Sequence, residues 1–464
     1  SESATTEERP TTPFTGEFGP ESRAALMAVR HVLTALTKSE ARKRARRAAV
    51  KTDYEASVTA VLCEAAVDLL ARGGKGFRIP RSMSVLEQRD RYRSRALNPQ
   101  LPVALDGLAG LGFIQQEKGF VEPASNKQWQ TAVWPAALVD LCDLHGLGLE
   151  DFRCDAPGDE IVLRRVVVSA DGTKRMEPVE YFDNPAIKIM RREMQIINDA
   201  LRAADIGLVS EHIVDLPFVD PMKRKLRRMF KLRPEHQNAG AAFREGGRLS
   251  GGFWLEHGFS SERRRNAILI DGEPVAEIDF GQAGLRILYG IAGARAALAS
   301  AEELSDDLYS GIAARAYDDQ ARDAVKSFVG ALMNTADDWQ ALLKLQGFAA
   351  KIVGRTFDDP RDVLKGAIIA VHRRHPAVAE FLPSEIGRQV QKVESDVLVQ
   401  VLLRLMNKGI CGLPVHDAVL VRHDRAEEAA ALMLRAFEDV AGVPGRVTIT
   451  RPVCPRKAVL RVGV

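Results

Sequence analysis

The chain has 464 residues, enough for about two to four domains, and its 46% hydrophobic and 27% charged residues are typical of a globular protein. Its net charge of +3 does not by itself indicate a nucleic-acid partner, and its five cysteines contain no Cys-x-x-Cys pair that would indicate a zinc site or a disulfide framework. No apolar run approaches the ~20 residues of a membrane span, and the N-terminus shows no signal-peptide pattern, so we expect a cytoplasmic protein without a membrane partner.

The N-terminal part is predicted to hold a tail and an accessory domain. Residues 1–22 are rich in Ser, Thr, Glu, Pro and Gly, which predicts a disordered tail. Residues 23–150 are predicted to form an accessory domain, with helices over 23–72 because apolar residues recur there at helical spacing.

Residues 82–145 resemble a winged helix. Its expected parts, in chain order, are a helix over 101–111, a hairpin over 113–121 with its turn at Lys118-Gly119, a strand over 131–134 and a helix reaching about residue 144. A winged shape does not establish recognition, so this domain either contacts DNA or is purely structural.

Residues 151–239 are predicted to contain a hairpin, a helix and a basic run. The hairpin spans 160–182 with Asp171-Gly172 as its turn. An amphipathic helix follows over 184–204. The basic run at 223–233, like a shorter run at 42–47, either neutralises phosphates or forms the solvated face of a helix.

Residues 240–464 alternate predicted strands and helices, which indicates a mixed α/β domain with large helical insertions. Two of its apolar, β-prone stretches end in an aspartate, Asp279 in the first and Asp417 in the second. Strands lying side by side would hold both carboxylates around a pair of Mg²⁺ ions, and paired metals stabilise the attacking and leaving oxygens of a phosphoryl transfer. This is the minimum equipment of a nucleotide polymerase.

Four segments resemble the motifs of family A polymerases, the superfamily that includes the single-subunit phage RNA polymerases. In chain order they are Gly247-Arg248-Leu249-Ser250, residues 277–286, Arg322-Asp323-Ala324-Val325-Lys326 and Val415-His416-Asp417. Gln391 and Asp396 also match the spacing of a Gln-x-x-x-x-Asp element before the last motif. The resemblance implies a right-hand polymerase, an α/β (α+β) fold with its palm at about 240–290 and 390–464. It also implies helical fingers at about 300–375 and a thumb-like helical region at 184–235.

The resemblance also implies residue roles. Asp279, Asp417 and the backbone carbonyl of Phe280 would bind two Mg²⁺ ions, with Mn²⁺ as an alternative. Arg322 and Lys326, one helical turn apart, would grip the triphosphate, and Lys326 would also protonate the leaving pyrophosphate. The primer and template contacts that the resemblance implies are Arg248, His416 and Gln391.

Several positions depart from the DNA-polymerase pattern. Gly281 replaces a serine of the first palm motif. Gly284 replaces the glutamate that blocks a ribose 2′-hydroxyl, and Ala418 replaces the third acid; the phage RNA enzymes share both departures. Asn334 replaces a tyrosine eight residues after Lys326 and either bonds a sugar hydroxyl or caps a helix end.

We therefore expect a polymerase that adds nucleotides from NTP or dNTP to a 3′-hydroxyl, tolerates ribonucleotides and acts like a primase in phage or plasmid replication. Its partners would be a DNA or RNA primer-template and nucleoside triphosphates. Three alternatives remain open: a DNA polymerase without proofreading, a catalytically silent nucleic-acid-binding replication factor, and a template-independent nucleotidyltransferase. No exonuclease signature is present, and residues 73–76 lack the P-loop spacing, so a fused helicase is not expected.

Overall fold

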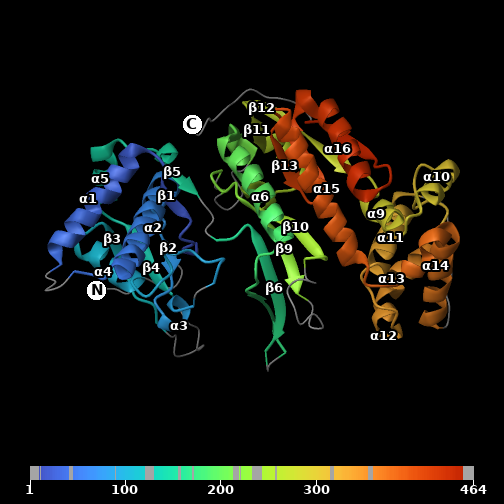
Figure 1. Cartoon of the computed structure of the whole chain (residues 1–464), viewed down its shortest axis with the longest axis horizontal. Helices are drawn as coiled ribbons and strands as arrows, with labels where there is room; N and C mark the ends of the chain where they lie inside the picture. Colours follow the sequence, from blue (N-terminus) through green and yellow to red (C-terminus); the bar gives the residue numbers. More distant parts are fainter. Residues whose placement is uncertain are drawn as a thin grey trace.

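A computed structural model describes most of the chain. The described residues are 10, 12–40, 45–88, 90–120, 130–154, 158–169, 172–212, 219, 221–232, 243–256, 259–313, 318–353 and 359–452. They form a mixed α/β structure with four sheets. The N-terminal elements lie at one end, a four-stranded sheet lies in the middle, and helices α10–α14 lie at the other end (Figure 1). In the described part of the chain, no helix is both long and apolar enough to cross a membrane.

The N-terminal elements share one hydrophobic core. The helices are α1 (Arg23–Ser39), α2 (Ala48–Arg72), α3 (Met83–Leu86), α4 (Leu101–Gly110) and α5 (Leu138–His145). The strands β2 (Phe77–Ile79), β4 (Thr131–Pro135) and β3 (Ile114–Glu117) form an antiparallel sheet in that order. The helices predicted over 23–72 and 101–111, the strand over 131–134 and the helix reaching residue 144 are confirmed.

Two N-terminal predictions are wrong. Residues 12–22, expected to be disordered, include β1 (Phe18–Pro20), which pairs with β5 (Phe152–Cys154). Phe14 is buried there and stacks on Phe77, so apolar anchors outweigh the polar composition. The hairpin predicted over 113–121, with its turn at Lys118-Gly119, does not form. Strand β3 pairs instead with β4, which begins at Thr131. Residues 1–9, 11, 41–44 and 121–129 lie outside the described residues.

The four-stranded sheet is built from segments on either side of helix α6 (Pro185–Ala203). Its order is β10 (Gly246–Gly251), β9 (Leu226–Leu232), β6 (Ile161–Val168) and β7 (Lys174–Pro178). Antiparallel pairing of β6 with β7 confirms the predicted hairpin, although Asp171 lies outside the described residues. Helix α6 is confirmed and begins after Asn184, whose side chain caps it.

The basic run at 223–233 is not a helix face, because most of it forms β9 at the centre of this sheet. The prediction of a thumb-like helical region at 184–235 is also wrong beyond α6, because two strands follow that helix. They are β8 (Ile206–Leu208) and then β9. Residues 213–218, 220 and 233–240 lie outside the described residues.

The largest sheet brings together strands from both halves of the predicted catalytic region. Its order is β13 (Gly412–Val415), β14 (Ala418–Arg422), β12 (Glu273–Phe280), β11 (Ile268–Ile270) and β8, and β15 (Val447–Thr450) also pairs with β12. Strands β11 and β12 join through Asp271-Gly272, whose positive φ angles of 53° and 76° suit a two-residue hairpin turn. Helices α15 (Gly387–Asn407) and α16 (Ala426–Ala441) pack on each other and on strands of this sheet, beside α9 (Ala283–Ile291) and α8 (Ser261–Ala267).

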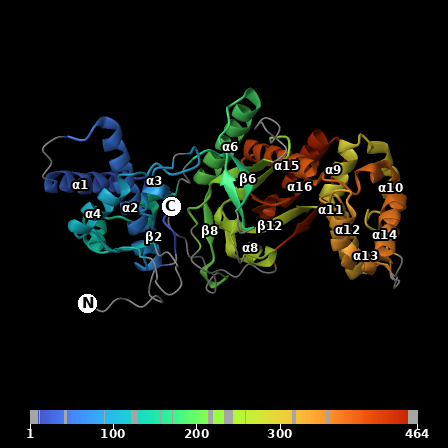
Figure 2. The ribbon, with the colours of Figure 1, turned by 90° about the horizontal axis from the view of Figure 1, so that it is seen from below.

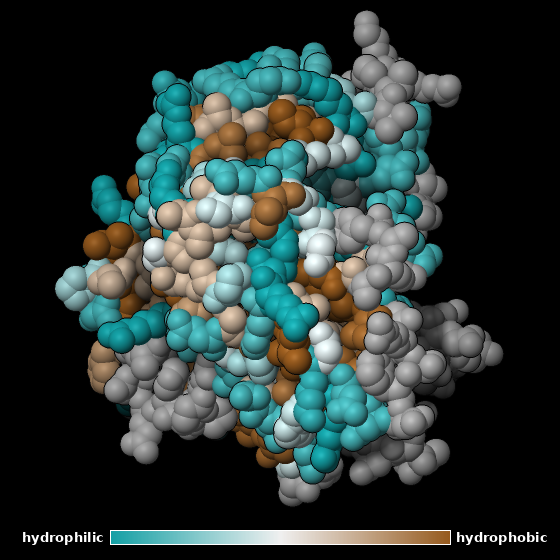
Figure 3. All heavy atoms as spheres, turned by 90° about the vertical axis from the view of Figure 1, so that its right-hand side faces the viewer, coloured by the Kyte–Doolittle hydropathy of each residue, from teal (hydrophilic) through white to brown (hydrophobic). Residues whose placement is uncertain are grey.

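A helical region extends from this sheet, as predicted for 300–375. It contains α10 (Arg295–Leu304), α11 (Asp319–Leu332), α12 (Trp339–Leu342), α13 (Gln346–Val353) and α14 (Pro360–Arg374). These helices lie together at one end of the molecule in two perpendicular views (Figures 1 and 2). Hydrophilic side chains cover most of that end, with apolar patches between them (Figure 3). Short 3-10 helices occur at Leu149–Asp151, Ser210–His212, Phe253–Leu255, Leu343–Leu345, Pro376–Phe381 and His423–Arg425.

A buried histidine ties the helical region to the sheet domain. His375 follows α14, its Nε2 lies 2.8 Å from the carbonyl of Leu308, and its Nδ1 lies 2.9 Å from the hydroxyl of Tyr289 on α9. Burial lowers the pKa of His375 to about 4. The neutral ring therefore donates through Nε2–H and accepts from the tyrosine, which anchors the segment around Leu308 above α9.

Candidate active site

The two strand-end aspartates lie at the same edge of the large sheet. Strand β12 pairs with β14 so that Asp279 is opposite Ala418, the residue after Asp417. Asp417 itself sits in the two-residue turn between β13 and β14, where His416 adopts a φ of 56°. The amide of Phe280 donates to the backbone carbonyl of Asp417 across 3.3 Å. The pairing predicted from two motifs about 140 residues apart therefore occurs.

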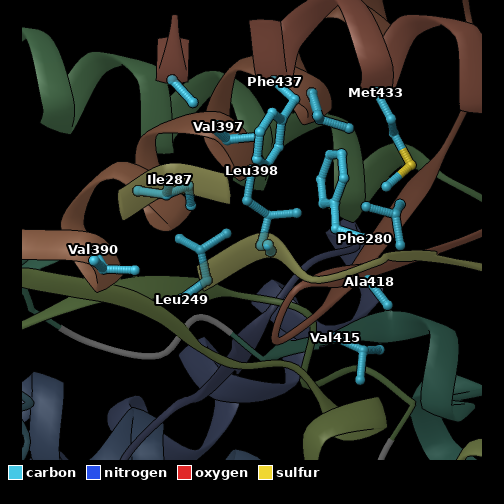
Figure 4. Close-up of a cluster of buried hydrophobic side chains, with 14 of the residues drawn as sticks. Leu249, Phe280, Ile287, Val390, Val397, Leu398, Val415, Ala418, Met433 and Phe437 are labelled. Atoms are coloured by element: carbon cyan, nitrogen blue, oxygen red, sulfur yellow. The ribbon is translucent and has the colours of Figure 1, made fainter. Parts of the chain in front are cut away.

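The hydrophobic core fixes the position of both strand ends. The Phe280 side chain is 4% exposed and its ring centroid lies 5.1 Å from that of Phe437 on α16. Figure 4 shows Phe280, Phe437 and Met433 grouped in this core, with Val397 and Leu398 from α15 nearby. Because the Phe280 side chain has no oxygen, only its backbone carbonyl could make the predicted metal contact.

The electrostatics of the carboxylate pair suit a divalent cation. Protein around the Asp279 carboxylate raises its pKa to about 6, although part of the residue reaches solvent. Burial is the largest cause of this rise, the charge of Asp417 contributes to it, and Lys326 opposes it. Two nearby carboxylates that repel each other are hard oxygen donors of the kind that Mg²⁺ prefers. Among the described residues no group of three or more His, Cys, Asp and Glu side chains could hold a metal, so this pair would need further oxygen ligands.

Helix α11 carries the two predicted triphosphate contacts. Asp318 caps this helix, and its apolar face is buried, so Arg322 and Lys326 lie one turn apart outside the core. The Arg322 guanidinium donates to Asp307 across 2.7 Å, and Asp307 also accepts from Gln282, three residues after Asp279. Asp307 therefore connects the helix to the turn that follows β12.

A cavity of about 250 Å³ brings together five of the predicted site residues. They are Arg248, Gly284, Lys326, Asn334 and Gln391. These residues come from β10, α9, α11 and α15 and from the residues just after α11. Lys326 lines this cavity and also acts electrostatically on Asp279. Arg322, His416 and the two aspartates do not line it.

The two sugar-gate positions have different surroundings. A Cβ at Gly284 would meet only Val390 Cγ1, at 3.8 Å, so the cavity is open on this side. Asn334 instead donates its side-chain amide to the carbonyl of Gly330 across 2.9 Å. The helix-capping alternative for Asn334 is therefore seen, and contact with a sugar hydroxyl remains a prediction.

The predicted primer contacts include a carboxylate that the sequence reading missed. Arg248 on β10 lies 3.6 Å from Glu394 on α15. Burial raises the pKa of Glu394 to about 7; Arg248 opposes this rise and Asp417 adds to it. Burial also lowers the pKa of His416, and Arg248 lowers it further, so these groups share one electrostatic environment. Glu394 lies between Gln391 and Asp396, the two residues of the predicted element on this helix. That position was the sequence signal that could have identified it.

Tyr309 is a second residue whose place in the site was missed. It lines the same cavity, is 5% exposed, and has the Arg322 guanidinium 5.6 Å from its ring centroid. Burial raises the pKa of Tyr309 to about 12. The segment Asp307-Leu308-Tyr309 precedes the motif on α11 in the sequence, but the place of Tyr309 in the cavity depends on how α9 and α11 pack.

Glu394→Gln is expected to stabilise the protein at pH 8 and to have little effect at pH 5. The pKa of Glu394 is about 7 in the folded protein, against a usual value of 4.5. Between pH 4.5 and pH 7 the folded state therefore holds a proton on this carboxyl group that the unfolded chain releases. Wild-type stability therefore falls as pH rises through this window, by on the order of 3 kcal/mol in total. Unfolding curves at both pH values test this, with exposed Glu380→Gln as the control. An equal effect of Glu394→Gln at both pH values would contradict it.

Comparison of the chain with protein-family models and with curated proteins finds no match.

Proposed function

We propose that the chain is a nucleic-acid polymerase that transfers nucleotides from NTP or dNTP to a 3′-hydroxyl. One observation carries the proposal: Asp279 and Asp417 lie together at strand ends, and Lys326 acts electrostatically on Asp279 from a helix that also borders an open cavity. In this proposal the large sheet with α9, α15 and α16 is the palm, and α10–α14 are the fingers.

The oxygen donors at the strand ends fit divalent cations. Asp279, Asp417 and the carbonyl of Phe280 would hold Mg²⁺, which when bound supplies positive charge that stabilises the oxygens of a phosphoryl transfer. Lys326 and Arg322 would neutralise the triphosphate, and Lys326 would hold the proton that the leaving pyrophosphate takes up. Arg248 and His416 would hold the primer end beside this cavity.

The N-terminal elements are proposed to form an accessory nucleic-acid-binding domain. Helices α2 and α4 pack against a three-stranded antiparallel sheet whose central strand, β4, comes last in the sequence. This arrangement supports the winged-helix resemblance. A structural domain without DNA contact remains the alternative.

Primer extension tests the proposed function. Labelled NTPs and dNTPs are supplied separately, with and without template and with and without primer, in the presence of Mg²⁺. Template-dependent extension is the expected result. Addition without template would identify a terminal transferase, and no addition under any condition, with binding retained, would identify a silent binding factor.

Gly284→Glu is expected to reduce NTP use selectively. Wild type should use NTPs at rates comparable with dNTPs, because Gly284 leaves the cavity wall open. A glutamate there would clash with the ribose 2′-hydroxyl of NTPs, which dNTPs lack, so it would select against NTPs only. The measurement is kcat/KM for each nucleotide class, with Gly284→Ala as the matched control that adds a Cβ without a carboxylate. Strong rejection of NTPs by wild type would remove the ribonucleotide part of the proposal.

A further inference from the structure

The basic run at 223–233 divides into structural cations and cations that border a cavity. Arg224 donates to the carbonyls of Pro221, Ala204 and Ile206, which ties together the chain around β8. Arg228 is 1% exposed and donates to Asp396 on α15 across 2.7 Å. These two guanidinium groups hold the fold.

Other cations of the run line a second cavity, of about 330 Å³, which we call the basic recess. Four cations and two carboxylates border it: Arg164, Lys223, Lys225, Arg227, Glu17 and Glu256. Glu17 comes from the N-terminal part and the cations from β6, β9 and the residues before β9, so the basic recess lies between the N-terminal elements and the four-stranded sheet. Its charged lining carries an excess of two positive charges.

Carboxylates partly offset the positive charge of the basic recess. Lys223 Nζ lies 3.8 Å from a carboxylate oxygen of Glu256, and Lys225 Nζ lies 3.4 Å from Glu160. Burial lowers the pKa of Arg227, and the charge of Arg164 lowers it further, whereas Glu17, Glu160 and Asp159 oppose this fall. An anion that entered the basic recess would relieve the cost of holding these cations together.

Strand alternation connects the basic recess to the candidate active site. Ser250 of β10 lies opposite Arg227 of β9, and Arg248 lies opposite Met229. Residues two apart on a strand share a face, about 7 Å from each other. The face that lines the basic recess therefore continues to Arg248, which lines the candidate active-site cavity. The opposite face holds the buried Arg228 and Leu249.

Two glycines shape the wall between these positions. Gly251 and Gly252 have φ angles of 101° and 78°, and a Cβ on Gly251 would lie 2.3 Å from the carbonyl oxygen of Lys225. The backbone therefore passes directly against the basic segment, with no side chain from these two residues on the wall of the basic recess.

We propose that the basic recess binds the phosphate backbone of a nucleic-acid strand that runs along this face of the four-stranded sheet to Arg248. A polymeric polyanion fits because the cations continue along a sheet face instead of enclosing one anion. The choice of nucleic acid as the anion rests on the proposed function. Binding itself requires neither catalysis nor a metal.

Binding of the full chain to labelled single strands tests this inference. Fluorescence anisotropy is measured with ~20-nucleotide DNA and RNA, in the Asp279→Asn background and without nucleotide or Mg²⁺, over a series of salt concentrations. Arg164→Gln/Arg227→Gln should weaken binding about tenfold and reduce the salt slope by about 1.4, because each lost phosphate contact removes about 0.7 for a single strand. Preference for DNA or RNA identifies the strand.

Arg165→Gln/Arg175→Gln is the matched control. Both side chains are exposed on the same sheet, and strand alternation directs them to the opposite face, near Glu177. This control should keep the wild-type affinity and slope. Thermal unfolding verifies folding of each variant, and Ser250→Glu, which adds a carboxylate to the basic recess from β10, should also weaken binding if the arginine pair cannot be replaced.

Wild-type affinity and slope in a folded recess variant would overturn the inference, as would absence of nucleic-acid binding by the parent protein. Failure of the proposed function looks different. A chain that adds no nucleotides but loses salt-dependent binding in the recess variants keeps the inference and loses the polymerase. A chain that extends primers, but whose recess variants bind nucleic acid normally, keeps the proposed function and loses this inference.

Discussion

Asp279→Asn or Asp417→Asn is expected to lower the rate of nucleotide addition by about 10³-fold or more. Each substitution removes one of two carboxylates that meet at the strand ends. Loss of several kcal/mol of transition-state stabilisation corresponds to a rate loss of this size. Single-turnover primer extension at saturating nucleotide measures it.

The fold should survive these substitutions. The Asp279 pKa of about 6 shows that its negative charge is disfavoured where it lies, so a neutral amide removes a repulsion. Glu273→Gln, at the other, exposed end of β12, is the matched control and should retain full activity. Mg²⁺ should raise the unfolding temperature of wild type and of the control but not of the aspartate variants. Substantial addition by either folded variant would rule out this metal site.

Lys326→Ala is expected to lower the rate of addition by about 10²- to 10⁴-fold, the range for loss of a positioned proton donor. Arg322→Ala should instead weaken nucleotide binding by about 10- to 100-fold, the value of charged hydrogen bonds of about 1.5–3 kcal/mol. The difference follows from position: Lys326 acts on Asp279, whereas Arg322 is held by Asp307 at the edge of the site. Rate and nucleotide affinity are measured separately by single-turnover kinetics.

Ser327→Ala on the exposed surface of the same helix is the control for α11. Asp307→Asn separates two roles of Arg322: if Asp307 only competes with the triphosphate for the guanidinium, the variant should bind nucleotide at least as tightly as wild type. Should both the Lys326 and Arg322 variants match wild type in rate and in affinity, α11 does not form the triphosphate site.

The sequence predicted the local parts of the candidate site because its signals are short-range. Apolar strands ending in Asp279 and Asp417 and a helix with cations four residues apart follow from periodicities of two and 3.6 residues. The structure contains β12, the β13–β14 hairpin and α11 where these patterns predicted them. Periodicity did not reveal Glu394 or Tyr309, since their place in the cavity depends on how α15 and α9 pack.

The fate of the basic run shows what only the tertiary structure decided. Consecutive cations look alike in the sequence, yet Arg228 is buried against Asp396, 168 residues away, while Arg227 borders the basic recess. No strand was predicted in this run. Strand β9 forms there because it pairs with β6, which precedes it in the chain, and with β10, which follows it. Local charge cannot specify such pairing: the free energy of burying one sheet face depends on distant segments, and it outweighs the weak local preference of a charged run for helix or strand.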